Sequence, residues 1–319
     1  MFSKDIVGPI GKLSSSVAIR SVTVLETLES IKQQTYKNIE LIISDDCSKD
    51  NTVDICRKWV ESNQSFFVRT AILIAEQNTG TSANCNRGVR NTKGEWIKLI
   101  AGDDRLLPNC ISDYVNYIQE NPNANIIFSK VIPFGNKDRI KDWAWADDSL
   151  LFERFNKRQM KILLCVRNPF PAASAFMRKE TILALGGYDE SIPIVEDWPF
   201  LIRATNEAGL EISFMNKQTA EYRFSESAVS HGNINYKHLE NIVMCEELGR
   251  YYLRKISPFS HFYFFTMSHV NDNFFMKLLH RINIINPFYH EYNSILRQYE
   301  EMQKDLFKKQ QSIFRSDTN

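Results

Sequence analysis

The sequence contains two pairs of adjacent aspartates, and each pair lies at the end of a short apolar segment of strand length. Asp45-Asp46 follows residues 38–44, and Asp103-Asp104 lies just beyond residues 95–100. In an open α/β sheet, ligands bind at the carboxyl ends of the strands, so we expect both pairs at one ligand-binding edge. Side chains of a strand alternate between its faces, and one member of each pair should therefore face a cleft.

Carboxylates in one cleft repel one another and raise each other's pKa unless a cation or hydrogen-bond donors compensate. Mg²⁺ or Mn²⁺ suits such a site, because each accepts few protein carboxylates and keeps positions for the phosphate oxygens of a substrate. The pattern therefore indicates a divalent cation near Asp103 and Asp104 that bridges the protein to a diphosphate. The competing interpretation is that each pair forms a turn or a helix cap, which is a common role of aspartates in loops.

Glu196 and Asp197 provide a third acidic position, at the predicted start of a helix. A partly buried carboxylate there could act as a general base toward a hydroxyl, although spacing alone favours a carboxylate stabilised by the helix macrodipole. Trp198 could stack on a ligand, but a core position is the preferred interpretation. Arg203 and Arg223 could each bind a diphosphate through the guanidinium fork, or pair with surface acids.

The elements that must position these residues alternate along the chain. From residue 22 to residue 130, helix-period segments alternate with short apolar strands, which is typical of a layered α/β domain with a mostly parallel sheet. The alternation then weakens, and we expect an irregular excursion over residues 137–167. Residues 229–319 are helical in pattern and rich in aromatic residues. We therefore expect an α/β domain over residues 1–228 and a helical C-terminal region over residues 229–319.

Composition excludes several classes of protein. Lysine and arginine (39) nearly balance aspartate and glutamate (38), so no global field favours nucleic acid. The six cysteines show no CxxC pair and no metal-ligand spacing, which fits reduced thiols in a cytosol. No apolar run is long enough to span a bilayer, and the start of the chain lacks a basic region followed by an apolar stretch. We expect a cytoplasmic protein without a signal peptide or a spanning helix.

Residues 24–224 resemble family 2 glycosyltransferases of the GT-A fold, of the bacterial polysaccharide type. VLETLESIKQQTYKNIELIISDDCSKDNT (24–52) is similar to that family's helix, strand and nucleotide-binding loop, which implies that Asp46 contacts the base. NTGTSANCNRGVRNTKGEWIKLIAGDD (78–104) is similar to the run that ends in the metal motif. The resemblance implies that Asp104 binds the metal and that Asp103 faces the ribose or the metal. The implied fold is Rossmann-like, with a mostly parallel central sheet flanked by helices.

Two further segments extend the resemblance. GGYDESIPIVEDWPFLIRA (186–204) resembles the acceptor-side segment, which implies that Asp197 is the catalytic base of a single inverting displacement, with Glu196 and Trp198 on the acceptor side. AEYRFSES (220–227) resembles the Tyr-Arg segment near the diphosphate and gives Arg223 a donor-binding role. The implied protein is an Mn²⁺- or Mg²⁺-dependent hexosyltransferase. It would move a sugar from a nucleotide-diphosphate donor, with UDP preferred, to a hydroxyl of a glycan or lipid-linked glycan acceptor in cell-surface polysaccharide synthesis.

The chain also departs from the family pattern. Ala101 stands where the metal motif often has an aspartate, and Ser225 stands where many members have a histidine, with His231 nearby but out of register. Residues 11–23 lack the apolar strand ending in Pro-x-Tyr-Asn that shapes the nucleoside pocket, so we expect the sheet to lack its usual first member. This departure motivates an alternative function, a degenerate, non-catalytic module that binds a nucleotide sugar or a partner. A sugar-phosphate nucleotidylyltransferase would need a Gly-rich phosphate-cradling loop near the start, and none is visible.

The C-terminal aromatics allow two interpretations. Residues 262–265 and 274–275, with Lys277, His280 and Arg281 close by, could lie in a membrane interface near a lipid-linked acceptor. That interpretation places the protein at the inner face of the cell membrane. The preferred interpretation is that these aromatics pack the helical region onto the α/β core.

Overall fold

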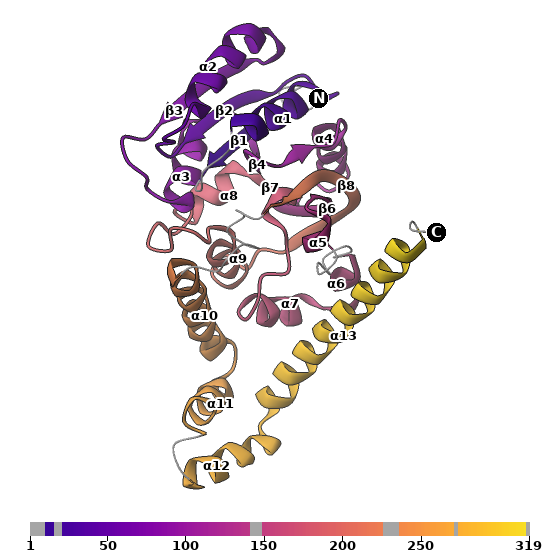
Figure 1. The fold of residues 1–319 in the computed structure, drawn as a ribbon. Coiled ribbons are helices and arrows are strands. Elements are labelled where there is room, and N and C mark those ends of the chain that lie inside the picture. Colours follow the sequence, from indigo (N-terminus) through magenta and orange to yellow (C-terminus); the bar gives the residue numbers. More distant parts are fainter. Residues whose placement is uncertain (1–9, 16–20, 141–148, 226–235, 271–273, 317–319) are drawn as a thin grey trace.

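A computed structural model describes residues 10–15, 21–140, 149–225, 236–270 and 274–316, and it is built around one eight-stranded sheet (Figure 1). The strand order is β3-β2-β1-β4-β7-β6-β8-β5. The strands are β1 (Ile10–Ser15), β2 (Glu40–Asp45), β3 (Arg69–Ile74), β4 (Trp96–Ala101), β5 (Arg105–Leu106), β6 (Ile126–Gly135), β7 (Phe176–Arg178) and β8 (Ile212–Phe224). The first four in this order are parallel, β7 is antiparallel to both neighbours, and β8 is parallel to β6 and antiparallel to β5. The predicted α/β class with a mostly parallel sheet is confirmed.

Helices flank the sheet and make up the C-terminal region (Figure 1). The helices are α1 (Ser21–Lys32), α2 (Thr52–Asn63), α3 (Thr81–Asn91), α4 (Cys110–Glu120), α5 (Lys137–Ile140), α6 (Ser149–Arg154), α7 (Lys157–Leu164), α8 (Lys179–Ala184), α9 (Asp197–Asn206), α10 (Tyr236–Ile256), α11 (Pro258–His269), α12 (Phe274–Arg281) and α13 (Pro287–Ser316). Short 3-10 turns are η1 (Gln64–Phe66), η2 (Ala172–Ser174) and η3 (Ile282–Ile285). The boundary expected after residue 228 lies outside the described residues and stays a prediction.

The expectation that the sheet lacks its first member is wrong. Strand β1 lies between β2 and β4 and pairs in parallel with both, with Ser15 opposite Asp45 and Ser14 opposite Ala101. Backbone pairing on both sides supplies the hydrogen bonds that a strand needs, whatever side chains stand at its end. The missing Pro-x-Tyr-Asn motif therefore does not remove the strand.

Two other expectations need correction. The region 137–167 is not simply irregular, because its described parts contain α5, α6 and α7. Helix α7 begins with a capping box, in which Asn156 and Gln159 satisfy each other's backbone amides. Strand β8 was not expected at all. It pairs with the whole length of β6, and a bulge at Asn216 and Lys217 interrupts the register.

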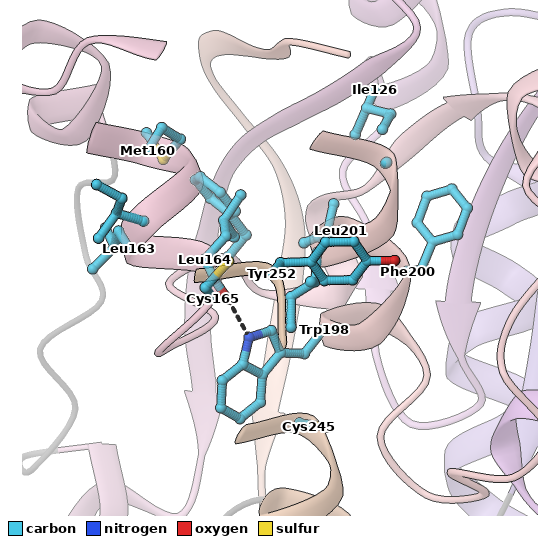
Figure 2. Packing of buried hydrophobic residues seen from close by; sticks show 14 of the residues in the cluster. Ile126, Met160, Leu163, Leu164, Cys165, Trp198, Phe200, Leu201, Cys245 and Tyr252 are labelled. Atoms are coloured by element: carbon cyan, nitrogen blue, oxygen red, sulfur yellow. Dashed lines mark hydrogen bonds between the residues drawn. The ribbon is translucent and has the colours of Figure 1, made fainter. Parts of the chain in front are cut away.

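Two hydrophobic clusters stabilise the molecule. One packs α1, α2 and α4 on the sheet, because α1 turns Val24, Leu28 and Ile31 inward at helical spacing. The other, seen in part in Figure 2, joins α7 and α9 to the C-terminal helices and includes Phe200 and Tyr252. The C-terminal helices therefore share their core with the α/β half of the chain.

Helices α10, α11 and α12 extend away from the sheet, and α13 returns toward it (Figure 1). We call α10 to α12 with η3 the arm. Helix α10 approaches the end of α7 very closely, because a Cβ at Gly249 would lie 1.7 Å from the carbonyl oxygen of Cys165. Among the described residues, none of the helices combines the length and the apolar content required to cross a bilayer.

Candidate active site

The two aspartate pairs lie at the same end of the sheet, at the carboxyl ends of two parallel strands. Strands β2 and β4 flank β1 in parallel and end at Asp45 and Ala101. Neighbouring strands lie about 4.8 Å apart, so the backbones of the two pairs are about 10 Å from each other. The expectation that both pairs emerge at one edge is confirmed.

Asp46 is buried, and hydrogen-bond donors surround its carboxylate. Oδ2 accepts from the amides of Thr79 (2.9 Å) and Gly80 (2.7 Å), and Oδ1 accepts from the Thr79 hydroxyl (2.6 Å). The Arg87 guanidinium lies 3.3 Å from Oδ1. Asp46 therefore fixes the loop that leads into α3 against the end of β2.

Asp45 fixes the turn that follows β2. Its carboxylate accepts from the amide (2.8 Å) and the hydroxyl (2.5 Å) of Ser48. Within this turn, Cys47 adopts a φ of 67°, in the left-handed region. This pair thus has the turn role that aspartates commonly play, in addition to any role toward a ligand.

The Asp103-Asp104 pair is held mainly through its backbone. The carbonyl of Asp104 accepts from the hydroxyl of Thr27 (2.6 Å), and the carbonyl of Asp103 accepts from Nε of Arg223 (2.7 Å). The Asp104 carboxylate accepts from the amide of Arg223 (2.8 Å), whose guanidinium also pairs with Glu26. Arg223, at the end of β8, therefore braces the acidic pair, and a direct contact with a diphosphate stays a proposal.

Burial makes this pair resist ionisation. It raises the pKa of Asp103, which its own amide and Arg223 partly lower again. It raises the pKa of Asp104 well above the usual range, and the neighbouring Asp103 carboxylate raises it further. Two adjacent carboxylates that are costly to ionise together would be stabilised by a cation.

Lys98 is a buried cation behind this pair, and the sequence reasoning missed it. It lies within β4 and is fully buried, and its ammonium donates to the carbonyls of Ala173, Ala175 (3.1 Å) and Leu99 (3.2 Å). Burial lowers the pKa of Lys98 to about 8, while the Asp104 carboxylate opposes that shift. A lysine in the otherwise apolar segment WIKLIA was the available signal.

The donor set of the pair fits a hard divalent cation. Among the described residues, no group of three or more His, Cys, Asp or Glu side chains could hold a metal ion. The protein would thus supply the carboxylates of Asp103 and Asp104, and a substrate diphosphate and water would supply the remaining oxygens. This is how Mg²⁺ is usually held in nucleotide sites.

Asp197 begins α9 as predicted, and its environment suits a general base. Its Oδ2 accepts from the side-chain amide of Asn168 (2.9 Å), and its Oδ1 accepts from the amide of Trp198 (2.7 Å). Burial raises the pKa of Asp197 to about 6, although these donors lower it. A carboxylate with a pKa near the working pH is well matched to taking a proton. The preceding Glu196 occupies the N-cap position without a capping bond from its side chain.

The loop before α9 connects Asp197 to the edge that carries Asp46. Ser82, at the start of α3, donates its hydroxyl to the carbonyl of Ile192 (2.6 Å) and its amide to that of Pro193 (3.2 Å). Gly80 packs so tightly on Pro193 that a Cβ there would lie 2.6 Å away. The segments bearing Asp46 and Asp197 are therefore joined through one packed loop.

Tyr188 is a second residue that sequence reasoning missed. Its ring packs on Phe200 (5.2 Å between centroids), and its backbone is clamped by the side chain of Asn86. Its buried hydroxyl has no hydrogen-bond partner in the described structure. Burial raises its pKa, and the carboxylates of Glu196 and Asp197 raise it further, so the hydroxyl lies in the field of both.

Two proposed ligand-binding side chains have structural roles instead. Trp198 is 8 % exposed and donates Nε1–H to the carbonyl of Leu164 (2.6 Å), so its ring lies in the core, which was the preferred interpretation (Figure 2). Arg203 donates to the carbonyls of Leu185 and Gly187 (both 2.6 Å) and thereby fixes the turn after α8. His231 lies outside the described residues.

Comparison with known proteins identifies the family of this chain. Residues 19–185 match the sequence model described as Glycosyl transferase family 2, and the chain belongs to this family. An uncharacterized glycosyltransferase of Haemophilus influenzae is 30 % identical over 189 residues, which cover 59 % of each chain. A PGL/p-HBAD biosynthesis glycosyltransferase of Mycobacterium bovis is 24 % identical, covering 70 % of this chain and 79 % of its own. The chain thus spans little more than half the length of the first of these relatives.

Solved structures agree on the fold. S. aureus TarS 1-349 in complex with UDP-GlcNAc has a TM-score of 0.55 at 15 % identity, covering 97 % of this chain and 92 % of its own. The mannosyltransferase PcManGT of Pyrobaculum calidifontis, in complex with GDP-Man and Mn²⁺, has a TM-score of 0.51 at 14 % identity and covers 95 % and 87 %. The protein therefore has the GT-A fold with a helical C-terminal region.

Proposed function

We propose that this family member is an inverting, metal-dependent hexosyltransferase. Its donor would be a nucleotide-diphosphate sugar, UDP-hexose first, and its acceptor a hydroxyl of a glycan or lipid-linked glycan in cell-surface polysaccharide synthesis. The observation that carries the proposal is the combination of the buried Asp104 carboxylate and its half-buried neighbour Asp103 at a strand end with a third carboxylate, Asp197, whose pKa is about 6. Asp197 begins α9, and the loop before it packs on α3, which follows the Asp46 loop. The UDP-GlcNAc complex of TarS supports the choice of donor.

The donor would lie along the edge formed by β2, β1 and β4. The Asp46 loop would contact the base, and Asp103 would face the ribose or the metal. Asp104 would hold the metal, while Arg223 would keep both aspartates in place and supply positive charge near the diphosphate. A bound Mn²⁺ or Mg²⁺ would neutralise the charge that develops on the departing diphosphate.

The chain's own residues would then perform one displacement. Asp197 would accept the proton of the acceptor hydroxyl, and the hydroxyl oxygen would bond to the anomeric carbon of the donor sugar. The bond between that carbon and the diphosphate oxygen would break, and the diphosphate would leave with its electron pair. Attack opposite the leaving group inverts the configuration of the anomeric carbon. Asn168 would position Asp197 through its hydrogen bond.

A donor screen tests the proposal. Release of nucleoside diphosphate would be measured for a set of nucleotide sugars with Mn²⁺, with Mg²⁺ and with a chelator. We expect release from a UDP-hexose that depends on metal, and a loss of transfer in Asp197→Asn of about 10²-fold to 10⁴-fold with UDP affinity nearly unchanged. Substantial residual transfer in that variant would reject Asp197 as the base.

The competing proposal is a non-catalytic module that binds a nucleotide sugar or a partner. It was motivated by the missing Pro-x-Tyr-Asn motif, and the presence of β1 weakens that motive. Calorimetry of UDP with Mn²⁺ beside the hydrolysis assay separates the two. Binding without turnover of any donor would favour the module.

We further propose a cytoplasmic protein that works at the inner face of the cell membrane. Residues 1–228 would bind the nucleotide sugar and catalyse transfer, and residues 229–319 would form the helical region. Fractionation of cells into soluble and membrane-bound pools, with and without high salt, tests this placement. Recovery outside the cytoplasm and the membrane pool would contradict it.

A further inference from the structure

The far end of the arm leaves an unusual share of apolar surface in water. We call residues 258–285 the arm tip. Its described and exposed apolar side chains are Phe259, Phe262, Phe265, Met267, Leu278, Ile282 and Ile285. Ile285 is 77 % exposed and Phe259 is 53 % exposed. The carbonyl of Phe259 accepts from the side-chain amide of Asn286 (3.1 Å), so Phe259 lies near Ile285, which precedes Asn286. Scattered apolar residues are normal on a surface, but a concentration of them marks a contact site.

The interior of the arm tip is partly polar, which is the reverse of the usual arrangement. The buried Asn283 amide donates to the hydroxyl of Thr266 (2.7 Å), and Asn286 donates to the Asn283 carbonyl (3.0 Å). Ser260, also fully buried, donates to a backbone carbonyl (2.7 Å). Polar groups bonded to each other inside and apolar side chains outside suit an element that meets a non-aqueous phase.

The residues of the run FYFF (262–265) differ in burial, so neither core packing nor membrane contact accounts for all of them. Tyr263 is buried and packs against Phe288 and Tyr292 of α13, so it stabilises the fold. The neighbouring Phe262 is 37 % exposed. Packing onto the core therefore accounts for only part of this aromatic sequence.

Charge identifies the kind of surface that the arm tip would meet. Residues 254–290 contain four lysines and arginines (Arg254, Lys255, Lys277 and Arg281) and a single acid, Asp272, which lies outside the described residues. All four basic side chains are exposed. The whole chain is nearly neutral, with a formal net charge of +1, so this excess is local. Exposed basic residues together with exposed aromatic residues in one segment are the composition of an interfacial helix on anionic lipid.

We propose that the arm tip docks on an anionic lipid surface, with Phe259 and Ile285 entering the interface and Lys277 and Arg281 meeting lipid phosphates. The arm tip would then be the part of the protein that contacts the inner face of the cell membrane. The base of the arm touches the acceptor-side loop, because the amide of Ile194 donates to the side chain of Asn241 in α10 (2.9 Å). If the proposed function holds, docking would present the Asp197 side to a lipid-linked acceptor. The docking itself does not depend on catalysis.

Co-sedimentation with vesicles tests the docking. The full chain would be mixed with vesicles of phosphatidylcholine containing phosphatidylglycerol, and with vesicles of phosphatidylcholine alone. We expect the chain in the pellet with anionic vesicles, markedly less with neutral ones, and release by high salt because the charged component is screened. A chain that stays in the supernatant with both vesicle types would overturn the proposal.

Paired variants identify the surface. Phe259→Ser with Ile285→Ser, and separately Lys277→Glu with Arg281→Glu, should each lower partitioning into anionic vesicles about tenfold or more. Phe66→Ser is a matched apolar control, since Phe66 is 47 % exposed and follows α2 at the opposite end of the molecule (Figure 1). Lys58→Glu is the charge control. Equal losses in the controls would overturn the assignment to the arm tip.

The same variants separate docking from catalysis and from self-association. Donor hydrolysis with a soluble assay should stay within about twofold of the wild type in all of them, because none touches the acidic edge. If the wild type binds vesicles but hydrolyses no donor, the proposed function is rejected and the docking proposal stands. A stable dimer in ultracentrifugation that Phe259→Ser with Ile285→Ser dissociates, without vesicle binding by the wild type, would assign the surface to a second copy and overturn the lipid proposal.

Discussion

The two aspartate pairs share a dipeptide and a position at the end of a parallel strand, yet the protein treats them differently. Asp46 is surrounded by donors from Thr79, Gly80 and Arg87, so its charge is satisfied within the chain. Asp104 has one backbone donor to its carboxylate and a second carboxylate beside it. A carboxylate that is already satisfied stabilises the structure, whereas one that is left unsatisfied is available for a ligand.

The largest expected effect is at the unsatisfied pair. Asp104→Asn keeps an oxygen for the amide of Arg223 but removes the charge that a divalent cation needs. We expect metal-dependent donor hydrolysis to fall about 10³-fold, equivalent to a loss of several kcal/mol of transition-state stabilisation. The melting temperature should stay equal or rise, because the variant no longer buries two repelling charges. Unchanged turnover across an Mn²⁺ titration would reject the metal assignment.

Asp46→Asn should show the opposite pattern, a loss of stability. Asp46 accepts hydrogen bonds on both oxygens, so the amide group of an asparagine must face N–H or O–H donors on one side. We expect the free energy of unfolding to fall by about 2 kcal/mol, since hydrogen bonds to a buried charge are lost and donors are left unsatisfied. Denaturant unfolding measures this change. If Asp46→Asn were as stable as the wild type, the two pairs would not differ in the way described.

The third carboxylate predicts how activity depends on pH. A pKa of about 6 means that Asp197 is protonated, and inactive as a base, in acid. We expect kcat/KM to fall about tenfold per pH unit below this value. The same raised pKa makes ionised Asp197 oppose folding: its contribution favours the folded state in acid and is lost as the pH rises through about 6. Asp197→Asn should therefore not lower the melting temperature at neutral pH, and an acid limb that persists in this variant would assign the limb to another group.

The smallest effect is expected at Asp45. Its contacts are local, to the amide and hydroxyl of Ser48, and an asparagine can form the same kind of turn. Asp45→Asn should change turnover by less than about threefold and stability by less than about 1 kcal/mol. A large loss of donor hydrolysis there would show that both pairs take part in catalysis and would remove the distinction between them.

Local patterns predicted the first half of the fold well, because helical and strand periods depend on neighbours in sequence. Strands β2 and β4 lie close to the expected apolar segments 38–44 and 95–100, and helices and strands alternate over residues 22–130 as expected. Strand β8 was missed because polar residues at its bulge, Asn216 and Lys217, break the alternation, and its partner β6 is far away in sequence. Strand β1 was rejected because one motif was absent, although pairing on both sides holds it in place.

The candidate site was predictable where chemistry follows strand ends and not where it depends on packing. The two aspartate pairs were found from spacing, whereas the role of Asp197 came from the family resemblance, because spacing alone favoured a carboxylate stabilised by the helix macrodipole. Spacing could not reveal that Lys98 is buried behind Asp104, or that the hydroxyl of Tyr188 has no partner in the described structure. The burial of Trp198 against Leu164 likewise depends on elements far apart in the chain.

The direction in which the arm points is determined at a position that carries no side chain. At Gly249 the backbone of α10 meets the carbonyl of Cys165 so closely that a methyl group would overlap the carbonyl oxygen. An alanine there would push α10 off the end of α7, and the displacement would grow along α11 and α12 because they lie beyond the contact. The angle between the strand ends that carry the aspartate pairs and any surface on which the tip rests is thus set by a residue without a side chain.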